Sequence, residues 1–210
     1  MYRLLVAAVI ITFALCSVWL LKSNQWTYST LFKFLKAEIF RFNQLMLIKI
    51  EPFKALRKVL YRITALLFLI LVISGFFPVL IFGQSLSGSL LIVHVTTAPI
   101  FVLFFTLSLL FNAHSQQFNL NDWNYVSQAE TEQKLSMRHR LVFWRKVCFW
   151  LFAVISLPAI LSVIISMYPL FGTEGQRFLL DLHRYSVLFL FIIAGIFFLL
   201  KLSIADVLQD

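Results

Sequence analysis

The chain has 210 residues, of which 61% are hydrophobic and only 13% are charged, and its mean hydropathy is +0.90. Soluble domains are closer to half apolar and a quarter charged, so long uncharged runs must account for the excess. Lysine and arginine outnumber aspartate and glutamate by 18 to 9, which gives a net charge of +9. These values exclude an ordinary soluble domain and indicate an integral membrane protein.

Five apolar runs are candidates for membrane-spanning helices: residues 4–21, 63–81, 88–113, 147–171 and 185–200. With their flanking residues, the last four are long enough to cross about 30 Å of hydrocarbon, which takes roughly 20 helical residues. The first run is long for the apolar part of a cleaved signal peptide, and no clean small-residue cleavage site follows it. Exporting the basic residues that come next would also oppose the positive-inside rule. We therefore expect a retained anchor.

The connections between these runs alternate in charge. Residues 22–62 and 114–146 are basic, whereas the turns at 82–89 and 172–177 carry few charges. Because basic connections stay in the cytoplasm, we expect an outside N-terminus, five crossings of a bacterial inner membrane and a cytoplasmic C-terminus. This topology accounts for the net charge, so nucleic-acid binding is not needed to explain it.

The pattern divides the chain into four parts. Residues 1–22 form the anchor, 23–60 a basic amphipathic segment, 61–201 a helical bundle and 202–210 a cytoplasmic tail. In the second part, aromatic and aliphatic residues recur at helical spacing among lysines, which is typical of a helix lying on an anionic membrane surface. Docking to a partner protein is the alternative. Pro52 is expected to start or break a helix.

The bundle contains an internal repeat. The stretch "FGQSLSGSLLIVH" at 82–94 aligns with "FGTEGQRFLLDLH" at 171–183, and "LVIS" (71–74) and "AVIS" (153–156) precede them. We therefore predict an all-α integral membrane fold, in which an N-terminal anchor helix precedes a four-helix transmembrane bundle made of two repeated helical hairpins. The second hairpin is longer before its turn, so the duplication is approximate.

The repeat places one histidine inside each hairpin, His94 and His183. An ionisable side chain within an apolar helix is costly and usually faces the interior of the bundle. Two neutral imidazoles at matching depth can ligate one iron axially, so a single b-type haem would satisfy both. The alternative is that each histidine hydrogen-bonds a carbonyl or a serine of a neighbouring helix.

Four stretches of the bundle resemble the cytochrome b subunits of membrane-bound formate dehydrogenases, and more loosely those of nickel hydrogenases and thiosulfate reductases. They read "RKVLYRITALLFLILVISGFF", "SLLIVHVTTAPIFVLFF", "HRLVFWRKVCFWLFAVIS" and "LLDLHRYSVLFLFIIAG", and the resemblance covers residues 57–201. It implies a four-helix cytochrome with two stacked haems, the outer one held by residues that match His94 and His183. The inner-haem ligands match Tyr61 and Phe197, which cannot replace imidazole, so we expect one haem b.

The resemblance also implies a quinone site near the inner end of the bundle. Where the family carries an Asn-Ala-Gly-Gln-Lys stretch, this chain has "SMRHR" at 136–140. His139 and Arg140 are therefore candidates for binding a quinone carbonyl, and Tyr61 and His114 are further candidates. A basic collar at the inner headgroups is the alternative for "SMRHR", and a surface position is the alternative for both of these histidines.

These features predict an electron-transfer subunit between a redox partner on the outer side and the quinone pool. The chain lacks obvious machinery for substrate oxidation, so we expect an iron-sulfur or multihaem cytochrome subunit as its partner in a respiratory complex. Arg184 is a candidate for pairing with a haem propionate, or it reaches toward the outer surface. The alternatives are a haem-free structural anchor and, ranked lower, a quinone-binding anchor of the succinate dehydrogenase type, which normally has three helices and no hairpin duplication.

Overall fold

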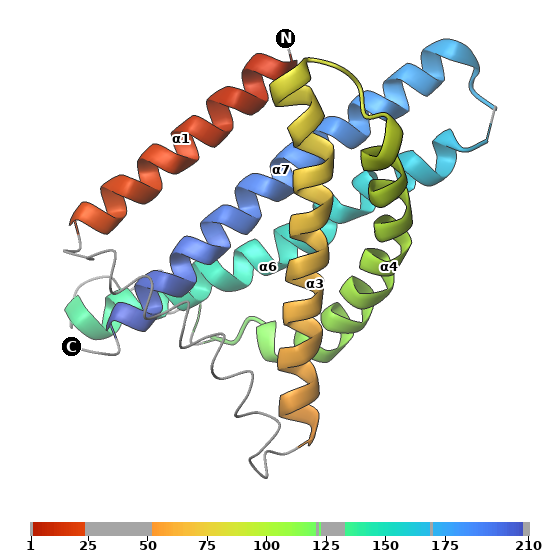
Figure 1. Cartoon of the computed structure of the whole chain (residues 1–210). Helices are drawn as coiled ribbons and strands as arrows, with labels where there is room; N and C mark the ends of the chain where they lie inside the picture. The colour runs from red at the N-terminus through yellow and green to blue at the C-terminus, as the bar shows by residue number, and fades with distance from the viewer. Residues whose placement is uncertain (1, 24–51, 121, 123–132, 169, 208–210) are drawn as a thin grey trace. The chain divides into compact units, whose positions relative to one another are not determined.

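The computed structural model describes residues 2–23, 52–120, 122, 133–168 and 170–207 (Figure 1). Every regular element within these residues is a helix, which confirms the all-α fold class. The chain separates into two compact units, Met1–Phe111 and Asn112–Asp210, and each unit is described by itself. The basic segment at 24–51, which we expect on the membrane surface, lies outside the described residues.

The first unit holds α1 (Tyr2–Ser23), α3 (Pro52–Phe77), a π-helical turn η1 (Pro78–Phe82) and α4 (Gly88–Ala113). α3 begins at Pro52, as expected, because proline at a first helical position loses no hydrogen bond and has its φ already set. The change to π-helical geometry starts at Pro78, where the missing backbone N–H interrupts the α-helical hydrogen-bond pattern.

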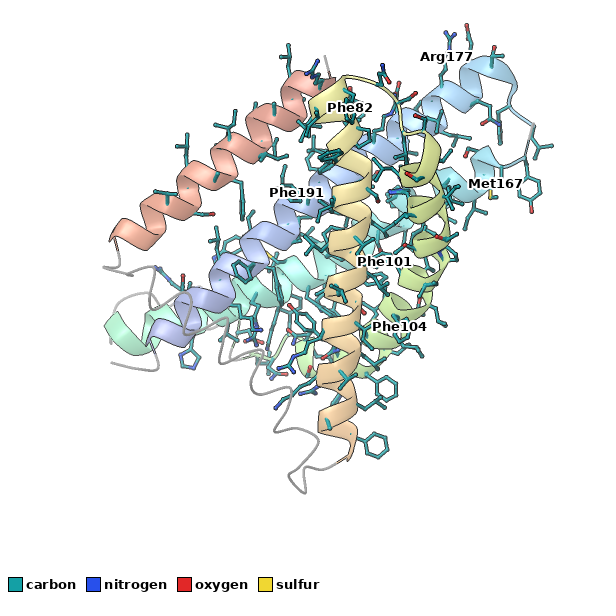
Figure 2. All side chains as sticks on the ribbon, viewed as in Figure 1. Phe82, Phe101, Phe104, Met167, Arg177 and Phe191 are labelled. Carbon is teal, nitrogen blue, oxygen red and sulfur yellow. The ribbon has the colours of Figure 1, made fainter. Side chains whose placement is uncertain are left out.

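The second unit holds the short 3-10 turn η2 (His114–Gln116) and two long helices, α6 (Gln133–Ser166) and α7 (Gly172–Val207). α6 and α7 form a hairpin, with Met167 and Arg177 on the two sides of its turn (Figure 2). α6 ends at Ser166, before the end of the apolar run at 147–171. A proline follows Tyr168 in the sequence, and it disfavours the helical conformation for the residue before it.

Four of the described helices are long and apolar enough to cross a membrane, which identifies a multi-pass membrane protein. The four spans are Ala55–Phe82, Gly88–Gln116, His139–Ser166 and Gly172–Lys201. The described apolar part of α1, Tyr2–Val18, is shorter than any of them. A fifth crossing by α1 therefore stays a prediction, as do the side of each terminus and the identity of the membrane.

The glycines that the repeat aligns have the same backbone conformation. Gly83 and Gly172 have φ angles of 64° and 60°, in the left-handed region that glycine adopts without steric cost. The hairpins differ after this point, because α7 begins at Gly172 itself, whereas α4 begins only at Gly88, after an irregular segment. The structure thus retains the aligned turn and shows that the duplication is approximate.

The N-terminal end of α1 lies at the same end of the first unit as the Gly83 turn. The Arg3 guanidinium donates from Nη2 to the carbonyl oxygen of Leu80 over 3.0 Å. A Cβ built on Gly83 would lie only 2.8 Å from Nη1 of the same arginine. Arg3 therefore joins the start of α1 to η1.

Polar and aromatic contacts join α3 to α4. Thr64 Oγ1 donates to the carbonyl of Leu60 in its own helix at 2.8 Å and reaches the carbonyl of Phe104 in α4 at 3.1 Å. The rings of Phe68 and Phe101 have centroids 5.9 Å apart (Figure 2 labels Phe101 and Phe104). These contacts fix the pairing of the two helices that position the first histidine.

Candidate functional site

His94 lies near the start of α4 and contacts α3. Its Nδ1 atom is 2.9 Å from the hydroxyl oxygen of Ser74, whose side chain is 3% exposed. The same hydroxyl lies 3.2 Å from the carbonyl oxygen of Leu71, one helical turn earlier. The serine of the repeated "LVIS" stretch therefore holds the imidazole of the facing helix.

Gly75 provides the space in which the His94 ring lies. A Cβ built on this glycine would be 3.3 Å from Cε1 and 3.7 Å from Nδ1 of His94. Because 3.3 Å is tighter than ordinary van der Waals contact, a side chain at this position would have to displace the ring by a few tenths of an ångström. Ser74 and Gly75 together therefore form a cradle for the imidazole, with a hydroxyl on one side and a missing side chain on the other.

His183 makes the corresponding contact in the second unit. Its Nδ1 atom lies 2.8 Å from the carbonyl oxygen of Ala159 in α6. A carbonyl oxygen can only accept, so Nδ1 carries the proton of the neutral ring and Nε2 carries the lone pair. The Ala159 carbonyl also accepts from the hydroxyl of Ser162 over 3.0 Å.

Small residues line α6 where it meets this histidine. Ser156 and Ser162 are each 1% exposed and Ala159 is 4% exposed. Small side chains let membrane helices approach closely, which brings a backbone carbonyl within reach of a side chain on the neighbouring helix. The sequence places His183 in α7, and the small residues of α6 explain which group it bonds.

Each histidine therefore bonds through Nδ1 to the first helix of its own hairpin. This is the arrangement usual for metal-ligating histidines, which donate one ring N–H to a carbonyl or hydroxyl and bind the metal through the other nitrogen. It is also the arrangement that the haem-free alternative expects, because there the histidines bond a carbonyl or a serine of a neighbouring helix. The hydrogen bonds at Nδ1 are therefore compatible with axial haem ligation through Nε2, and they are equally compatible with the haem-free alternative.

The described residues contain no group of three or more histidine, cysteine, aspartate or glutamate side chains that could hold a metal ion by themselves. Axial ligation of a haem needs only two protein side chains, since the porphyrin supplies the other four nitrogens.

The remaining sequence-predicted candidates lie at several places. Arg184 donates to Asp181, one turn earlier in α7, over 3.1 Å, and both side chains are well exposed. Tyr61 is 38% exposed on α3, and His114 is exposed in η2. His139 is half-buried and Arg140 is exposed near the start of the third span. None of these positions tests the quinone and propionate roles, which stay predictions.

An ion pair between Lys146 of α6 and Asp122 was not predicted from the sequence. Lys146 is 8% exposed although it lies inside an apolar span, and its Nζ is 2.6 Å from Asp122 Oδ2 and 3.0 Å from the carbonyl of Gln117. Four residues further along α6, Trp150 Nε1 donates to the carbonyl of Gln116 over 3.0 Å. We call these two side chains with Gln116, Gln117 and Asp122 the strap.

The carboxyl of Asp122 is stabilised in its charged form. Burial alone would raise its pKa, but the backbone N–H of Asn119, the ammonium of Lys146 and nearby His139 together hold the pKa below its ordinary value of 3.8. The Asn119 N–H donates to Oδ2 over 2.7 Å. Sequence reasoning counted Lys146 only as part of a basic loop. Its helical register with Trp150 was the available signal, since the two share one face of α6.

No protein-family model, curated protein or solved structure matches the chain.

Proposed function

We propose that the chain is a membrane-embedded b-type cytochrome subunit of a respiratory complex, with His94 and His183 as the axial ligands of one haem b. One observation carries the proposal. The internal repeat puts a histidine at the same aligned position of both hairpins, and each is bonded through Nδ1 to the first helix of its own hairpin. A lone structural histidine needs no counterpart, whereas axial ligation needs two.

The local chemistry of each histidine supports the ligand role. A hydrogen bond at Nδ1 orients the ring, and where Nδ1–H is the donor it leaves the lone pair on Nε2 and raises the basicity of that nitrogen. Within an apolar helix the neutral imidazole is the form that costs least to bury, and it is the form that binds iron. The protein would supply ligands, orientation and burial, while a bound haem would supply one-electron chemistry.

The proposed route runs between a redox partner on the outer side of a bacterial inner membrane and quinone in the bilayer. An iron-sulfur or multihaem cytochrome subunit would be that partner. The N-terminus lies outside and the C-terminus in the cytoplasm, because the connections rich in lysine and arginine are then cytoplasmic. Arg184, the residue after His183, is the candidate partner of a haem propionate. His139, Arg140, Tyr61 and His114 are the candidates for contact with quinone.

A haem-free structural anchor of such a complex is the second candidate function. It is favoured by the fact that both histidines already bond groups in their own hairpins, at 2.9 Å to Ser74 and 2.8 Å to Ala159. In that case the imidazoles act only as interhelical hydrogen-bonding groups, which are worth about 0.6 kcal/mol on average in membrane proteins.

Optical spectroscopy of the full chain, expressed with haem precursor and purified in detergent, separates the two functions. We expect a dithionite-reduced b-type α-band, one haem per chain, and loss of that band in both His94→Ala and His183→Ala. His114→Ala is the matched control, because this exposed histidine lies outside the apolar repeat. A wild-type chain without haem would support the anchor and contradict the cytochrome, and two haems per chain would contradict the roles given to Tyr61 and Phe197.

A further inference from the structure

We propose that Ser74 is a positioning residue for His94 and that its hydroxyl makes His94 the weaker of the two axial ligands. This inference rests on the proposed function. It concerns a serine to which neither the repeat nor the resemblance gives a role, and it follows from a chemical difference between the groups that hold the two histidines.

The Ser74 hydroxyl carries one proton and has two neighbours that compete for it. When the proton points to the carbonyl of Leu71, the oxygen accepts from Nδ1–H of His94, and Nε2 then presents a lone pair to iron. When the hydroxyl rotates to donate to Nδ1, the ring proton must lie on Nε2, which cannot then ligate iron. The rotation of this hydroxyl therefore affects which tautomer of His94 is present.

The group that holds His183 allows no such choice. A carbonyl oxygen accepts and never donates, so the bond to Ala159 requires the proton on Nδ1 and the lone pair on Nε2 at all times. His183 is thus set for ligation before haem arrives, whereas His94 is set only in one of two hydroxyl orientations. We infer that the bond to His94 is the weaker one and breaks first.

The position of the His94 ring makes Ser74 hard to replace. Gly75 leaves the ring only enough space to lie against the α3 backbone, with Cε1 at 3.3 Å from the position a Cβ would take. Ser74 is 3% exposed, so water has little access to substitute for its oxygen. Loss of the hydroxyl therefore leaves Nδ1 without the group that orients it on this side.

The repeat supplies a matched control. Ser156, the serine of "AVIS", is 1% exposed, and its hydroxyl donates to the carbonyl of Ala153 over 2.7 Å, the same one-turn bond that Ser74 makes to Leu71. Among the contacts of the described residues, Nδ1 of His183 is bonded to the carbonyl of Ala159 and not to the Ser156 hydroxyl. Ser156→Ala removes an equally buried hydroxyl without touching the tautomer of a histidine.

The first test titrates the purified, full-length apoprotein with haemin. Removing the partner of a ligating histidine costs about 10–100-fold in metal affinity, so we expect Ser74→Ala to weaken haemin binding by at least about tenfold. The variant should also show a high-spin ferric signal in electron paramagnetic resonance and bind carbon monoxide when reduced. Ser156→Ala should match the wild type, and Ser74→Thr, which keeps the hydroxyl, should restore the low-spin signal. Equal affinity and spin state in Ser74→Ala and Ser156→Ala would overturn the inference.

A second measurement does not depend on haem. Nitrogen-15 resonances of labelled histidines report the tautomer in the apoprotein, and we expect only Nδ1–H for His183 and two tautomers for His94. Ser74→Ala should change the His94 ratio and leave His183 unchanged; if that variant does not fold, the nearly isosteric Ser74→Cys replaces it. An unchanged His94 ratio would refute the role of Ser74. A wild type that binds no haemin would refute the proposed function and with it the ligand role of His94, whereas the tautomer measurement would still decide whether Ser74 positions the ring.

Discussion

The Nδ1 atom of His183 lies 2.8 Å from the carbonyl oxygen of Ala159, so a side chain of α7 is bonded to the backbone of α6. The approach is possible because the facing surface of α6 is formed by small, buried residues, with Ser156 and Ser162 on either side of the alanine. A larger residue at this point would separate the helices and lengthen the bond. The packing and the histidine geometry are therefore coupled.

Ala159→Leu should destabilise the second unit and weaken haem binding together. Overpacking a tight site costs about 1–3 kcal/mol, and the displaced carbonyl would no longer hold Nδ1 of His183. The free energy of unfolding in detergent micelles and the haem content of the same preparation measure the two effects. Val154→Leu, at a position that is 59% exposed on the same helix, is the control and should change neither. Normal stability and haem content in Ala159→Leu would contradict the coupling.

The repeat in the sequence predicted much of this arrangement, because it depends on local signals. Glycines at the aligned turns, proline at the start of α3 and uninterrupted apolar runs each act within a few residues of the chain. The partners of the histidines could not be predicted in the same way. Whether His183 meets Ala159 or the serine one turn earlier depends on how far α6 extends before its turn, and that length differs between the hairpins.

The strap illustrates a different limit. In the sequence, Lys146 directly precedes a long apolar run, so it is interpreted as a basic residue at the cytoplasmic membrane surface, and Asp122 is interpreted as a loop residue. Only the fold of residues 114–120 and 122 brings the two within 2.6 Å. The helical register of Lys146 and Trp150 indicates that they share one face of α6. Which groups they meet depends on a non-local contact that neither hydropathy nor helical periodicity encodes.

Lys146→Met should destabilise the second unit. Removing one partner of a fully buried ion pair costs about 3–5 kcal/mol because the other charge is left uncompensated. This pair is part-buried, so we expect a smaller loss that still exceeds that of an exposed pair. In this case the remaining charge is that of Asp122, whose side chain is 14% exposed. Chemical unfolding in detergent measures the loss. Asp181→Asn removes the exposed pair with Arg184, and such pairs contribute about 0–1 kcal/mol, so a similar loss in both variants would contradict a special role for the strap.

The strap should also make stability depend on pH in the acid range. The pKa of Asp122 is lowered in the folded protein from its ordinary value of 3.8, so the folded state binds the proton less tightly than the unfolded state. Its contribution is therefore complete above about pH 4 and is lost as the pH falls through the lower, folded value. The free energy of unfolding measured from pH 6 downward should fall less steeply in Asp122→Asn than in the wild type. Parallel curves would show that the carboxylate contributes nothing.

Thr64→Val should weaken the α3–α4 hairpin by a modest amount. The threonine hydroxyl reaches the Phe104 carbonyl at 3.1 Å, and interhelical bonds of this kind contribute about 0.6 kcal/mol on average and at most about 1.7 kcal/mol. Thr106→Val is the matched control, because its hydroxyl is exposed and bonds only its own helix, at the carbonyl of Val102, among the contacts described. If the two variants lose equal stability, the contact to Phe104 carries no interhelical energy.

A labelling experiment can check whether the N-terminus and the Gly83 turn lie on the same side of the membrane. The bond of Arg3 to Leu80 puts the start of α1 at the same end of the first unit as the Gly83 turn, so both should lie on one side of the membrane. In a cysteine-free background, Ser85→Cys and Thr173→Cys should react with a membrane-impermeant maleimide in intact cells, and an N-terminal epitope should be accessible to antibody. Ser115→Cys, at the other end of the span Gly88–Gln116, should react only after lysis. Labelling of Ser85→Cys and Ser115→Cys from the same side would mean that this helix does not cross, because an apolar helix of this length places its two ends on opposite sides of about 30 Å of hydrocarbon.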